Sequence, residues 1–429
     1  MTDNKNTILA IALSALVLIV WQFFFAMPQE KARQEKLQAQ QQQQQQLAQK
    51  QQAGQAPAPG GTAQAPGVAP AAAPAQVPGQ APQSPAAIAA NREAAIKASP
   101  RVQIATDSLQ GSIDLKGGRI DDLALVKFRE TVDPKSPPIV LLSPSGGPEP
   151  FYAEFGWTNA VGGAVKVPSA DTVWTQAGSG ALSATHPVTL TYDNGQGIEF
   201  RRTIKVDDKY LFTIKDEVVN KSASPVTLYP YALISRHGTP PTLGYYILHE
   251  GMVGVLGKDG LQEYTYKKIE EKKDVAFDVT NGWLGFTDKY FAAALLPDTT
   301  AHLKAHYKAG EIGTLKTYQT DYLLDGVAVA PGATGAADAR LFAGAKEVAV
   351  INAYEQQLKP NRFDLLIDWG WFYFITKPMF VVIDYFYHLI GNFGLAILIV
   401  TVLIKAAFFP LANKSYASMA KMKAVQPQM

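Results

Sequence analysis

Two long apolar segments, one near each end of the chain, constrain this sequence more than any other feature. The first, Thr7–Met27, carries no charged residue and is long enough, at the rise of a helix, to cross a hydrocarbon core about 30 Å thick. The second runs from about Phe393 to Phe409, where we expect it to end before Pro410, and it contains one charge, Lys405. Both segments are predicted to be membrane helices.

The orientation of these helices follows from the charges beside them. Lys414, Lys421 and Lys423 follow the second helix with no acidic residue among them, which places that end in the cytoplasm. Lysines and arginines on both sides of the first helix give a conflicting signal, but the rule is weak for long translocated segments. No small-x-small cleavage site lies near Ala26, so we expect the first helix to remain as an uncleaved anchor. With the end of the second helix in the cytoplasm, we expect a cytoplasmic N-terminus and a large domain outside.

Lys405 needs an explanation, because an unpaired ammonium is costly in lipid. One reading is that its side chain extends past Phe409 toward the cytoplasmic water. The other is that it belongs to a polar stripe, since Thr401 lies one helical turn earlier on the same face. Physics alone leaves both open, and Thr401 favours the stripe.

Composition argues against several classes of function. The chain has 39 Lys and Arg against 37 Asp and Glu, a formal net charge of +2, so no strong field attracts nucleic acid. It has no cysteine, and no phosphate loop or serine elbow is present. His302 and His306 have the spacing of a metal pair on a helix, but their segment has the pattern of a strand, which would separate the rings. We therefore expect no enzyme, no metal and no cofactor.

Residues 29–100 are rich in glutamine, alanine and proline and are predicted to be a tether. From Arg101 to about Ala343 short apolar or alternating runs are separated by turn signals such as Asp193–Gly197 and Val206–Tyr210. The predicted strands include VQIAT, GSIDL, PIVLL, VKV, VTLTY, IEFRRTIKV, YLFTIKDEVV and VTLYPYAL. This pattern indicates a large antiparallel β-sandwich, followed by a helix within 344–359.

An aromatic segment, Leu365–Asn392, separates this domain from the second membrane helix. It is interrupted by charged residues, and Pro378 is expected to break any single span. Such a helix lies in the membrane interface, although an amphipathic helix packed on the outer domain has the same pattern. The residues expected at headgroup depth are Trp369, Trp371, Phe374, Phe380 and Tyr387.

The expected fold class is therefore mixed, with membrane α-helices and a β-sandwich outside the membrane. The expected order is an anchor at 1–28, a tether at 29–100, the β-sandwich domain with its C-terminal helix at 101–363, an interfacial helix at 364–391, a membrane helix at 392–411 and a basic segment at 412–429.

The order of segments, together with DWGWFYFITKPMF, GNFGLAILIVTVLIKAAFFPL and NKSYASMAKMKAVQP, resembles the YidC family of bacterial membrane protein insertases. The likeness is strong from Asp364 onward and is supported by GGRIDDLAL and NGWLGFTDKYFAAALLP. The resemblance implies a periplasmic β-supersandwich and five core helices around a hydrophilic groove. It also implies that Lys405 stands where the family usually has an arginine, and that 412–429 begins a cytoplasmic hairpin.

Further expectations follow from this resemblance. The chain would act on nascent membrane proteins in the bilayer of the bacterial inner membrane, with the Sec translocon and, from the cytoplasmic side, the ribosome as partners. It would be a multi-pass protein, and the sequence up to Met429 would be a fragment that lacks four core helices. The alternatives are a membrane-tethered carbohydrate-binding β-sandwich or a periplasmic scaffold, which glycan titration and the downstream sequence would distinguish.

Overall fold

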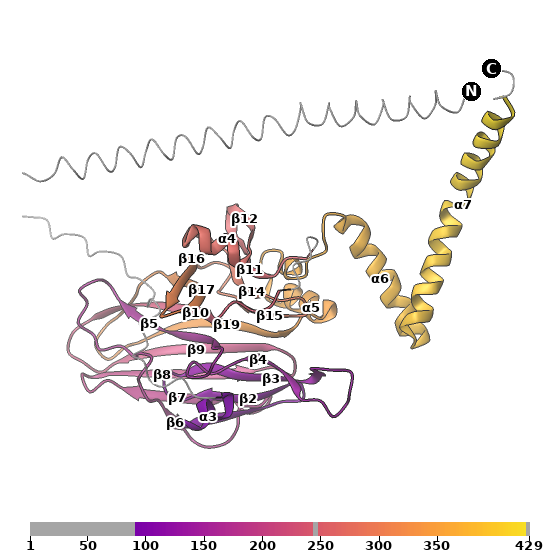
Figure 1. The fold of residues 1–429 in the computed structure, drawn as a ribbon. Coiled ribbons are helices and arrows are strands. Elements are labelled where there is room, and N and C mark those ends of the chain that lie inside the picture. The colour runs from indigo at the N-terminus through magenta and orange to yellow at the C-terminus, as the bar shows by residue number, and fades with distance from the viewer. Residues whose placement is uncertain (1–90, 243–247, 426–429) are drawn as a thin grey trace, which may run out of the picture. The chain divides into compact units, whose positions relative to one another are not determined.

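The structure is a computed structural model that describes residues 91–242 and 248–425 (Figure 1). The described residues belong to two compact units, which meet in the chain between Lys377 and Pro378. The predicted anchor helix, Thr7–Met27, and the tether up to residue 90 lie outside the described residues.

The larger unit contains two β-sheets. The first has ten strands, with β4 added to β3 and β18 added to β10 at its sides. Its main path runs β1 (Arg101–Ala105), β2 (Leu109–Asp114), β3 (Arg119–Arg129), β5 (Phe151–Asn159), β10 (Val226–His237), β17 (Leu315–Leu324), β16 (His302–Ile312) and β13 (Asp274–Thr280), with β4 at Pro138–Leu142 and β18 at Val327–Val329.

The second sheet has nine strands. Its order is β12 (Gly260–Tyr264), β11 (Gly251–Leu256), β14 (Gly282–Thr287), β15 (Phe291–Leu295), β19 (Thr334–Ala345), β9 (Leu211–Asn220), β8 (Ile198–Val206), β7 (Val188–Asp193) and β6 (Thr175–Ala177). Neighbouring strands in both sheets pair antiparallel, as in β8 against β9 and β10 against β17.

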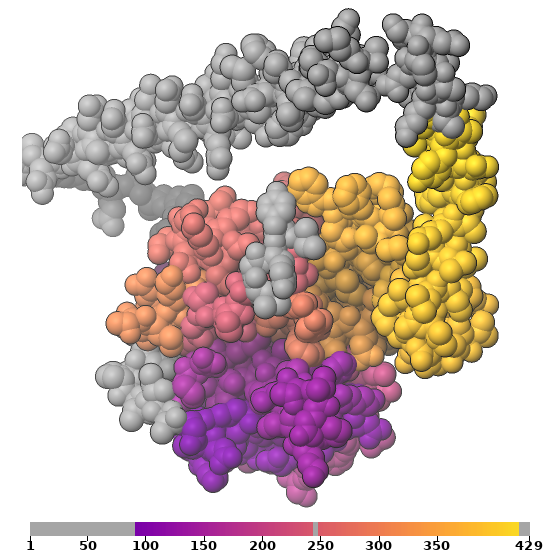
Figure 2. Space-filling view, turned by 45° about the vertical axis from the view of Figure 1, so that its right-hand side comes forward, coloured from indigo at the N-terminus to yellow at the C-terminus, as the bar shows by residue number. Residues whose placement is uncertain are grey.

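The strands form because apolar and polar residues alternate along them. In β8 buried residues occupy every second position, so one face turns to the core and the other toward water. The inward faces of both sheets contribute to one apolar cluster, which includes Trp157 and Phe155 from the first sheet and Phe200, Phe212 and Phe342 from the second. The predicted antiparallel β-sandwich is confirmed, because both sheets contribute to this cluster. Figure 2 shows one face of the domain in space-filling form.

The predicted turn at Asp193–Gly197 joins β7 to β8. Gly195 and Gly197 take φ angles of 72° and 81°, which side chains with a Cβ rarely adopt. The Asp193 carboxylate accepts from the backbone N–H of Gly195 at 2.8 Å, and the Asn194 side chain accepts from that of Gln196 at 2.8 Å. These side chains therefore fix the turn locally.

One predicted strand is wrong. Val165–Val167 has strand composition but forms no ladder. The carbonyl of Val165 instead accepts from the Asn159 amide at 2.8 Å, and the carbonyl of Lys166 accepts from the Asn194 amide at 3.0 Å. Asparagine side chains therefore bond the backbone groups that a neighbouring strand would have bonded.

The folded region also begins before Arg101. Helix α3 (Arg92–Lys97) starts at Asn91, whose side chain accepts from the Ala94 N–H at 2.9 Å. Arg92 forms an ion pair with Asp122 on β3, and Ala95 is buried. Residues 91–100, which the sequence assigned to the tether, thus contain a short helix that is paired with the sheet.

Three further short elements lie between the strands and at the end of the domain, and one longer helix follows β19. They are η2 (Gly257–Asp259), α4 (Tyr266–Lys272), α5 (Val348–Leu358) and η3 (Phe363–Leu366). The helix predicted within 344–359 is confirmed as α5, whereas α4 was not predicted. Phe363 of η3 packs edge-on against Trp283 and Phe342, with ring centroids 5.2 and 5.8 Å away.

Two helices follow, α6 (Tyr373–Ile390) and α7 (Phe393–Val425). Pro410 lies inside α7, so the expected helix end at Pro410 is wrong. Pro378 also lies inside α6, which continues through it as a helix, but among the described helices α6 is not one that is long and apolar enough to cross a membrane. A proline removes one backbone donor, and helices in membrane proteins tolerate that loss more readily than the rule for exposed helices suggests. Around Pro410, residues such as Ala406 and Leu411 also favour a helix.

Candidate functional site

The connection between α6 and α7 is a tight turn built from two residues. Gly391 has a φ of 74°, and its N–H donates to the carbonyl of Tyr387 at 2.7 Å, which ends α6. The side chain of Asn392 then accepts from the N–H of Leu395 at 3.1 Å, which caps the start of α7. The sequence Gly-Asn therefore defines where the aromatic helix stops and the apolar helix begins.

Helix α7 has the length and composition of a membrane span. Among the helices that the structure describes, it is the one that is long and apolar enough to cross a membrane, over Phe393–Met419. An 18-residue window of it reaches a mean hydropathy of 2.4. Most of its large apolar side chains, among them Leu398, Val402 and Phe409, are exposed. Such a surface requires an apolar environment.

Lys405 and Thr401 lie four residues apart on α7, one turn from each other. The Thr401 hydroxyl donates to the carbonyl of Ile397 at 2.8 Å, so its proton is satisfied by its own helix. Lys405 is exposed, and no ion pair to it occurs among the described residues. The site is thus one cation beside one hydroxyl oxygen in the otherwise apolar first part of α7, Phe393–Phe409.

The five aromatic residues expected in the interface lie in or just before α6. Trp371 is 83% exposed, Phe374 61% and Tyr387 40%, whereas Trp369 and Phe380 are half-buried. Trp369 precedes α6, and its ring centroid lies 5.8 Å from the ammonium of Lys377. Exposed aromatic side chains in such number are unusual on a surface that faces only water.

A polar stripe runs along the second half of α6. His388 donates from Nδ1 to the carbonyl of Asp384 at 2.9 Å and lies 3.5 Å from its carboxylate, an i,i+4 pair. Phe380 and Tyr387 are seven residues apart and share a face, about 60–80° around the helix from this stripe. Aromatic residues beside a polar stripe are typical of a helix that lies along a membrane surface.

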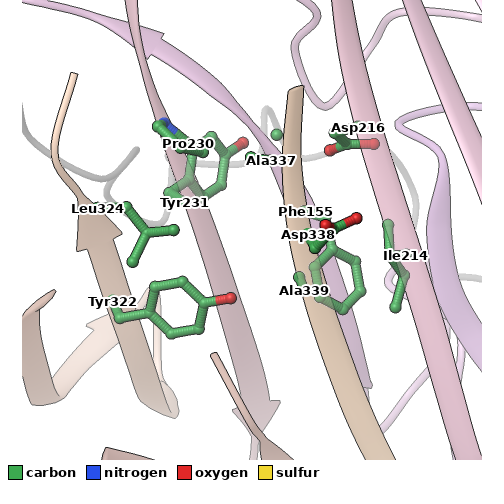
Figure 3. A pocket seen from close by; sticks show the side chains of 11 residues that line it. Phe155, Ile214, Asp216, Pro230, Tyr231, Tyr322, Leu324, Ala337, Asp338 and Ala339 are labelled. Atoms are coloured by element: carbon green, nitrogen blue, oxygen red, sulfur yellow. The ribbon is translucent and has the colours of Figure 1, made fainter. Parts of the chain in front are cut away.

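The β domain contains a small cavity that could hold a ligand only if the ligand were very small. This cavity of about 10 Å³ lies between the sheets, lined by Phe155 and Tyr322 of the first sheet and by Ile214, Asp216 and Ala339 of the second (Figure 3). That volume accepts about one water molecule and no sugar ring.

The other candidate groups of the domain are already bonded. His302 lies between Asp278 and Asp325, with nitrogen-to-oxygen distances of 2.6 and 3.0 Å, and His306 bonds Asp274 at 2.9 Å. Both histidines are on the extended strand β16. In the part of the chain that the structure describes, no group of three or more His, Cys, Asp or Glu side chains could hold a metal ion.

The lysines of the expected basic segment belong to α7 itself, because the helix continues past Pro410. Lys414 is exposed on it, while the side chains of Lys421 and Lys423 lie outside what the structure describes. Sequence reasoning missed a contact near the start of α6, where Lys377 lies 2.9 Å from Asp364. The two residues are thirteen positions apart and belong to different helices, η3 and α6, so the spacing along the sequence does not predict their contact.

Comparison with known proteins places this geometry in a family. A family model described as the YidC periplasmic domain matches residues 101–382, and one described as the 60Kd inner membrane protein matches residues 385–429. Among solved structures, a galactose mutarotase related enzyme from Lactobacillus acidophilus covers 57% of this chain and 97% of its own at 10% identity, with a TM-score of 0.38, which is too low to argue from.

Two curated relatives match the whole chain. The membrane protein insertase YidC of Bradyrhizobium diazoefficiens is 60% identical over 441 residues, which cover 100% of this chain and 69% of that protein. The membrane protein insertase YidC of Nitrobacter hamburgensis is 59% identical over 438 residues, which cover 100% of this chain and 68% of that protein. This chain therefore belongs to the YidC family of inner-membrane proteins.

Proposed function

We propose that the chain functions as part of a membrane protein insertase, which assists proteins into the inner membrane without making or breaking a covalent bond. The family supports this proposal, because the relatives of the chain are named membrane protein insertases. The structural observation that supports this function most directly is Lys405, the one charged residue within Phe393–Phe409 of α7, with Thr401 beside it. A soluble protein would gain nothing from such a helix.

Lys405 and Thr401 would act as a polar strip along a water-containing groove. Opposite unit charges 4 Å apart attract by about 1 kcal/mol in bulk water and by about 4 kcal/mol at an effective dielectric constant of 20. A carboxylate or polar loop that must enter the bilayer is therefore attracted more strongly beside Lys405 than it is in water. This attraction lowers the cost of moving the group part of the way across.

The aromatic residues Trp369, Trp371, Phe374, Phe380 and Tyr387 would hold α6 along the periplasmic surface of the bilayer. Aromatic rings prefer the headgroup region, and the Asp384–His388 stripe gives the helix a side that can face water. The aromatic segment and α7 would then meet the membrane in succession, as the Gly391–Asn392 turn permits.

The proposed topology is multi-pass, with a cytoplasmic N-terminus and a periplasmic β domain. Helix α7 has 33 residues, which corresponds to about 50 Å and exceeds a hydrocarbon core of about 30 Å. Its C-terminal part would therefore extend into the cytoplasm, where Lys414, Lys421 and Lys423 satisfy the preference for positive charge on that side.

The proposed partners are nascent membrane proteins, the Sec translocon and, through the basic cytoplasmic end of α7, the ribosome. Free nucleic acid is not among the proposed partners, because a net charge of +2 produces no strong attraction for it. No cofactor is required, because insertion is driven by partitioning of apolar segments rather than by a chemical reaction.

The test is reconstitution of the full-length protein in lipid vesicles with a radiolabelled single-span substrate. Protection of the substrate's translocated end from added protease is the expected result. Vesicles without the protein measure spontaneous insertion. Equal protection in both preparations, with the protein shown to be folded and correctly oriented, would contradict the insertase function.

A further inference from the structure

The last segment of the β domain contains a buried carboxylate that ties three pieces of chain together. Asp364, in η3, is 7% exposed. Its carboxylate accepts from Nε of Arg362 at 3.0 Å and from the ammonium of Lys377 at 2.9 Å. Its backbone N–H donates to the Glu355 side chain of α5 at 3.1 Å. We call Glu355, Arg362, Asp364 and Lys377 the Asp364 clasp.

The clasp connects η3 to the N-terminal part of α6, because Lys377 is the fifth residue of that helix. Further bonds fix the intervening segment. The Asp368 carboxylate accepts from the backbone N–H of His249 at 2.9 Å and from that of Gly370 at 2.8 Å. The Thr376 hydroxyl donates to the carbonyl of Trp369 at 2.8 Å. The segment 364–377 is therefore bonded to the domain at both of its ends.

Between these ends lies the most exposed aromatic run of the described domain. Trp371, Phe372, Tyr373, Phe374 and Ile375 are 83%, 64%, 59%, 61% and 53% exposed. We call these five residues the aromatic turn. Their side chains are therefore largely accessible on the surface of the domain.

The charges show that Asp364 stays ionised in this position. Burial alone would raise the pKa of its carboxyl group, but hydrogen bonds from Arg362 and Lys377 outweigh burial and hold that pKa below its ordinary value. Loss of either cation would leave a buried acid with part of its bonding missing, which is costly. The domain therefore favours conformations in which Lys377 stays in place.

We propose that Asp364 is a positioning residue that holds the aromatic turn at a fixed place on the β domain, so that the domain meets the periplasmic leaflet in one orientation. The inference rests on the proposed membrane role of the aromatic residues. It goes beyond that role by naming the contact between Asp364 and Lys377 as the one that determines the orientation of the domain at the membrane surface. The ion pair reaches from η3 to the fifth residue of α6, so it acts on the aromatic turn that lies between them.

The experiment measures the distance between two spin labels by pulsed electron paramagnetic resonance, in the full chain reconstituted in lipid nanodiscs. The chain has no cysteine, so Lys205→Cys on β8 and Ile375→Cys in the aromatic turn give two labelled sites without background. The expected result for the otherwise unchanged chain is one narrow distance distribution. Asp364→Asn and Lys377→Met should each broaden it and shift its mean, whereas Lys377→Arg should keep it narrow.

A matched control removes another ion pair of the domain. Lys116 lies 2.9 Å from Asp171, the same separation as Lys377 from Asp364, but both of its members are exposed loop residues. Lys116→Met should leave the distribution narrow. If Asp364→Asn unfolds the domain, the result for Lys377→Met tests the proposal instead. Lys377 is the more exposed member of the pair, so its replacement disturbs the buried part of the domain less.

A distribution that stays narrow in both Asp364→Asn and Lys377→Met would overturn the proposal, as would a broad one in the unchanged chain. The membrane role is read separately, from relaxation of the Ile375 label by lipid-soluble oxygen and by a water-soluble nickel complex. Greater access to the nickel complex would refute the interface assignment, while the distance data would still report whether the clasp orders the turn.

Discussion

Arg202 and Asp216 form a two-point ion pair directly across strands β8 and β9, in the middle of the β domain. The Nε and Nη2 atoms of Arg202 lie 2.7 and 2.8 Å from the two carboxylate oxygens of Asp216. The guanidinium also donates to the carbonyls of Gly118 and Phe155, at 3.0 and 2.5 Å, which belong to the first sheet or its loops. One buried cation thus joins both sheets.

Removing Asp216 should therefore destabilise the domain strongly. Burial disfavours the charged form of Arg202, and Asp216 compensates for that cost. We expect Asp216→Ala to lower the free energy of unfolding by about 3–5 kcal/mol, because it leaves a buried charge unpaired. The double change Arg202→Met with Asp216→Ala should cost less than Asp216→Ala alone, since it leaves neither charge of the pair buried.

Urea unfolding of the β domain, followed by circular dichroism, measures this effect. The control is Glu217→Ala, which breaks the exposed pair with Lys215 on the same strand and should leave the midpoint nearly unchanged. If Asp216→Ala and Glu217→Ala shifted the midpoint equally, Arg202 would have found another partner.

The β domain should fold by itself when it begins at Asn91 and ends near Asp368. The whole apolar cluster lies between these limits, and α3 with its Arg92–Asp122 ion pair is retained. A second version that begins at Arg101 should melt at a lower temperature, because it loses that pair and the buried Ala95. Circular dichroism should show mainly strand and a cooperative melt. A mainly helical spectrum, or identical melting of both versions, would contradict these expectations.

His237 should make the domain sensitive to mild acid. Burial and the positive charge of Arg119 lower the pKa of this histidine from 6.5 to about 4. The unfolded chain then takes up a proton first on acidification, so the free energy of unfolding should fall between pH 6.5 and pH 4 by about 3 kcal/mol. Above pH 6.5 this contribution is complete and constant.

The measurement is urea unfolding at a series of pH values. His237→Gln should flatten the dependence between pH 6.5 and pH 4, whatever its effect at pH 7. His186→Gln, at an exposed histidine, serves as the control and should retain the full slope. An unchanged slope in His237→Gln would assign the acid sensitivity to other groups.

The sequence predicts the strands of this fold well because their signals are local. The alternation of β8 and β9 and the turn at Val206–Tyr210 are visible in the residues themselves. That turn also determines the register, so Arg202 opposite Asp216 could have been read from it. The apolar part of α7 follows from composition in the same way, whereas the C-terminal end of the helix does not.

Other features depend on contacts that no local pattern carries. Lys377 meets Asp364 because η3 and α6 are held in a particular geometry, which spacing along the chain does not reveal. Helix α3 is short and lies in an alanine-rich stretch, so its pairing with Asp122 decides that it folds. The helix continues through Pro410 because the apolar residues around that proline favour it, contrary to the general rule.

The charge of Lys405 can be tested in the complete protein. If it serves a groove, Lys405→Arg should be tolerated, because the cation is kept. Lys405→Leu and Lys405→Glu should impair insertion of substrates with acidic or polar translocated segments, and strongly hydrophobic substrates should suffer less. The measurements are growth complementation and protease protection of one acidic and one apolar substrate. Thr401→Val, which removes only the hydroxyl oxygen, should have a smaller effect than Lys405→Leu.

The two readings of Lys405 differ because they assign its charge to different surroundings. A cation in a confined, water-containing groove attracts a carboxylate more strongly than bulk water would allow, so its removal raises the barrier for acidic substrates in particular. A lysine that only reaches the cytoplasmic interface makes no contact with substrate, and leucine in its place lengthens the apolar part of α7 and anchors the helix better. Full insertion of both substrates by Lys405→Leu would therefore leave Lys405 as an interfacial residue and remove the groove charge from the mechanism.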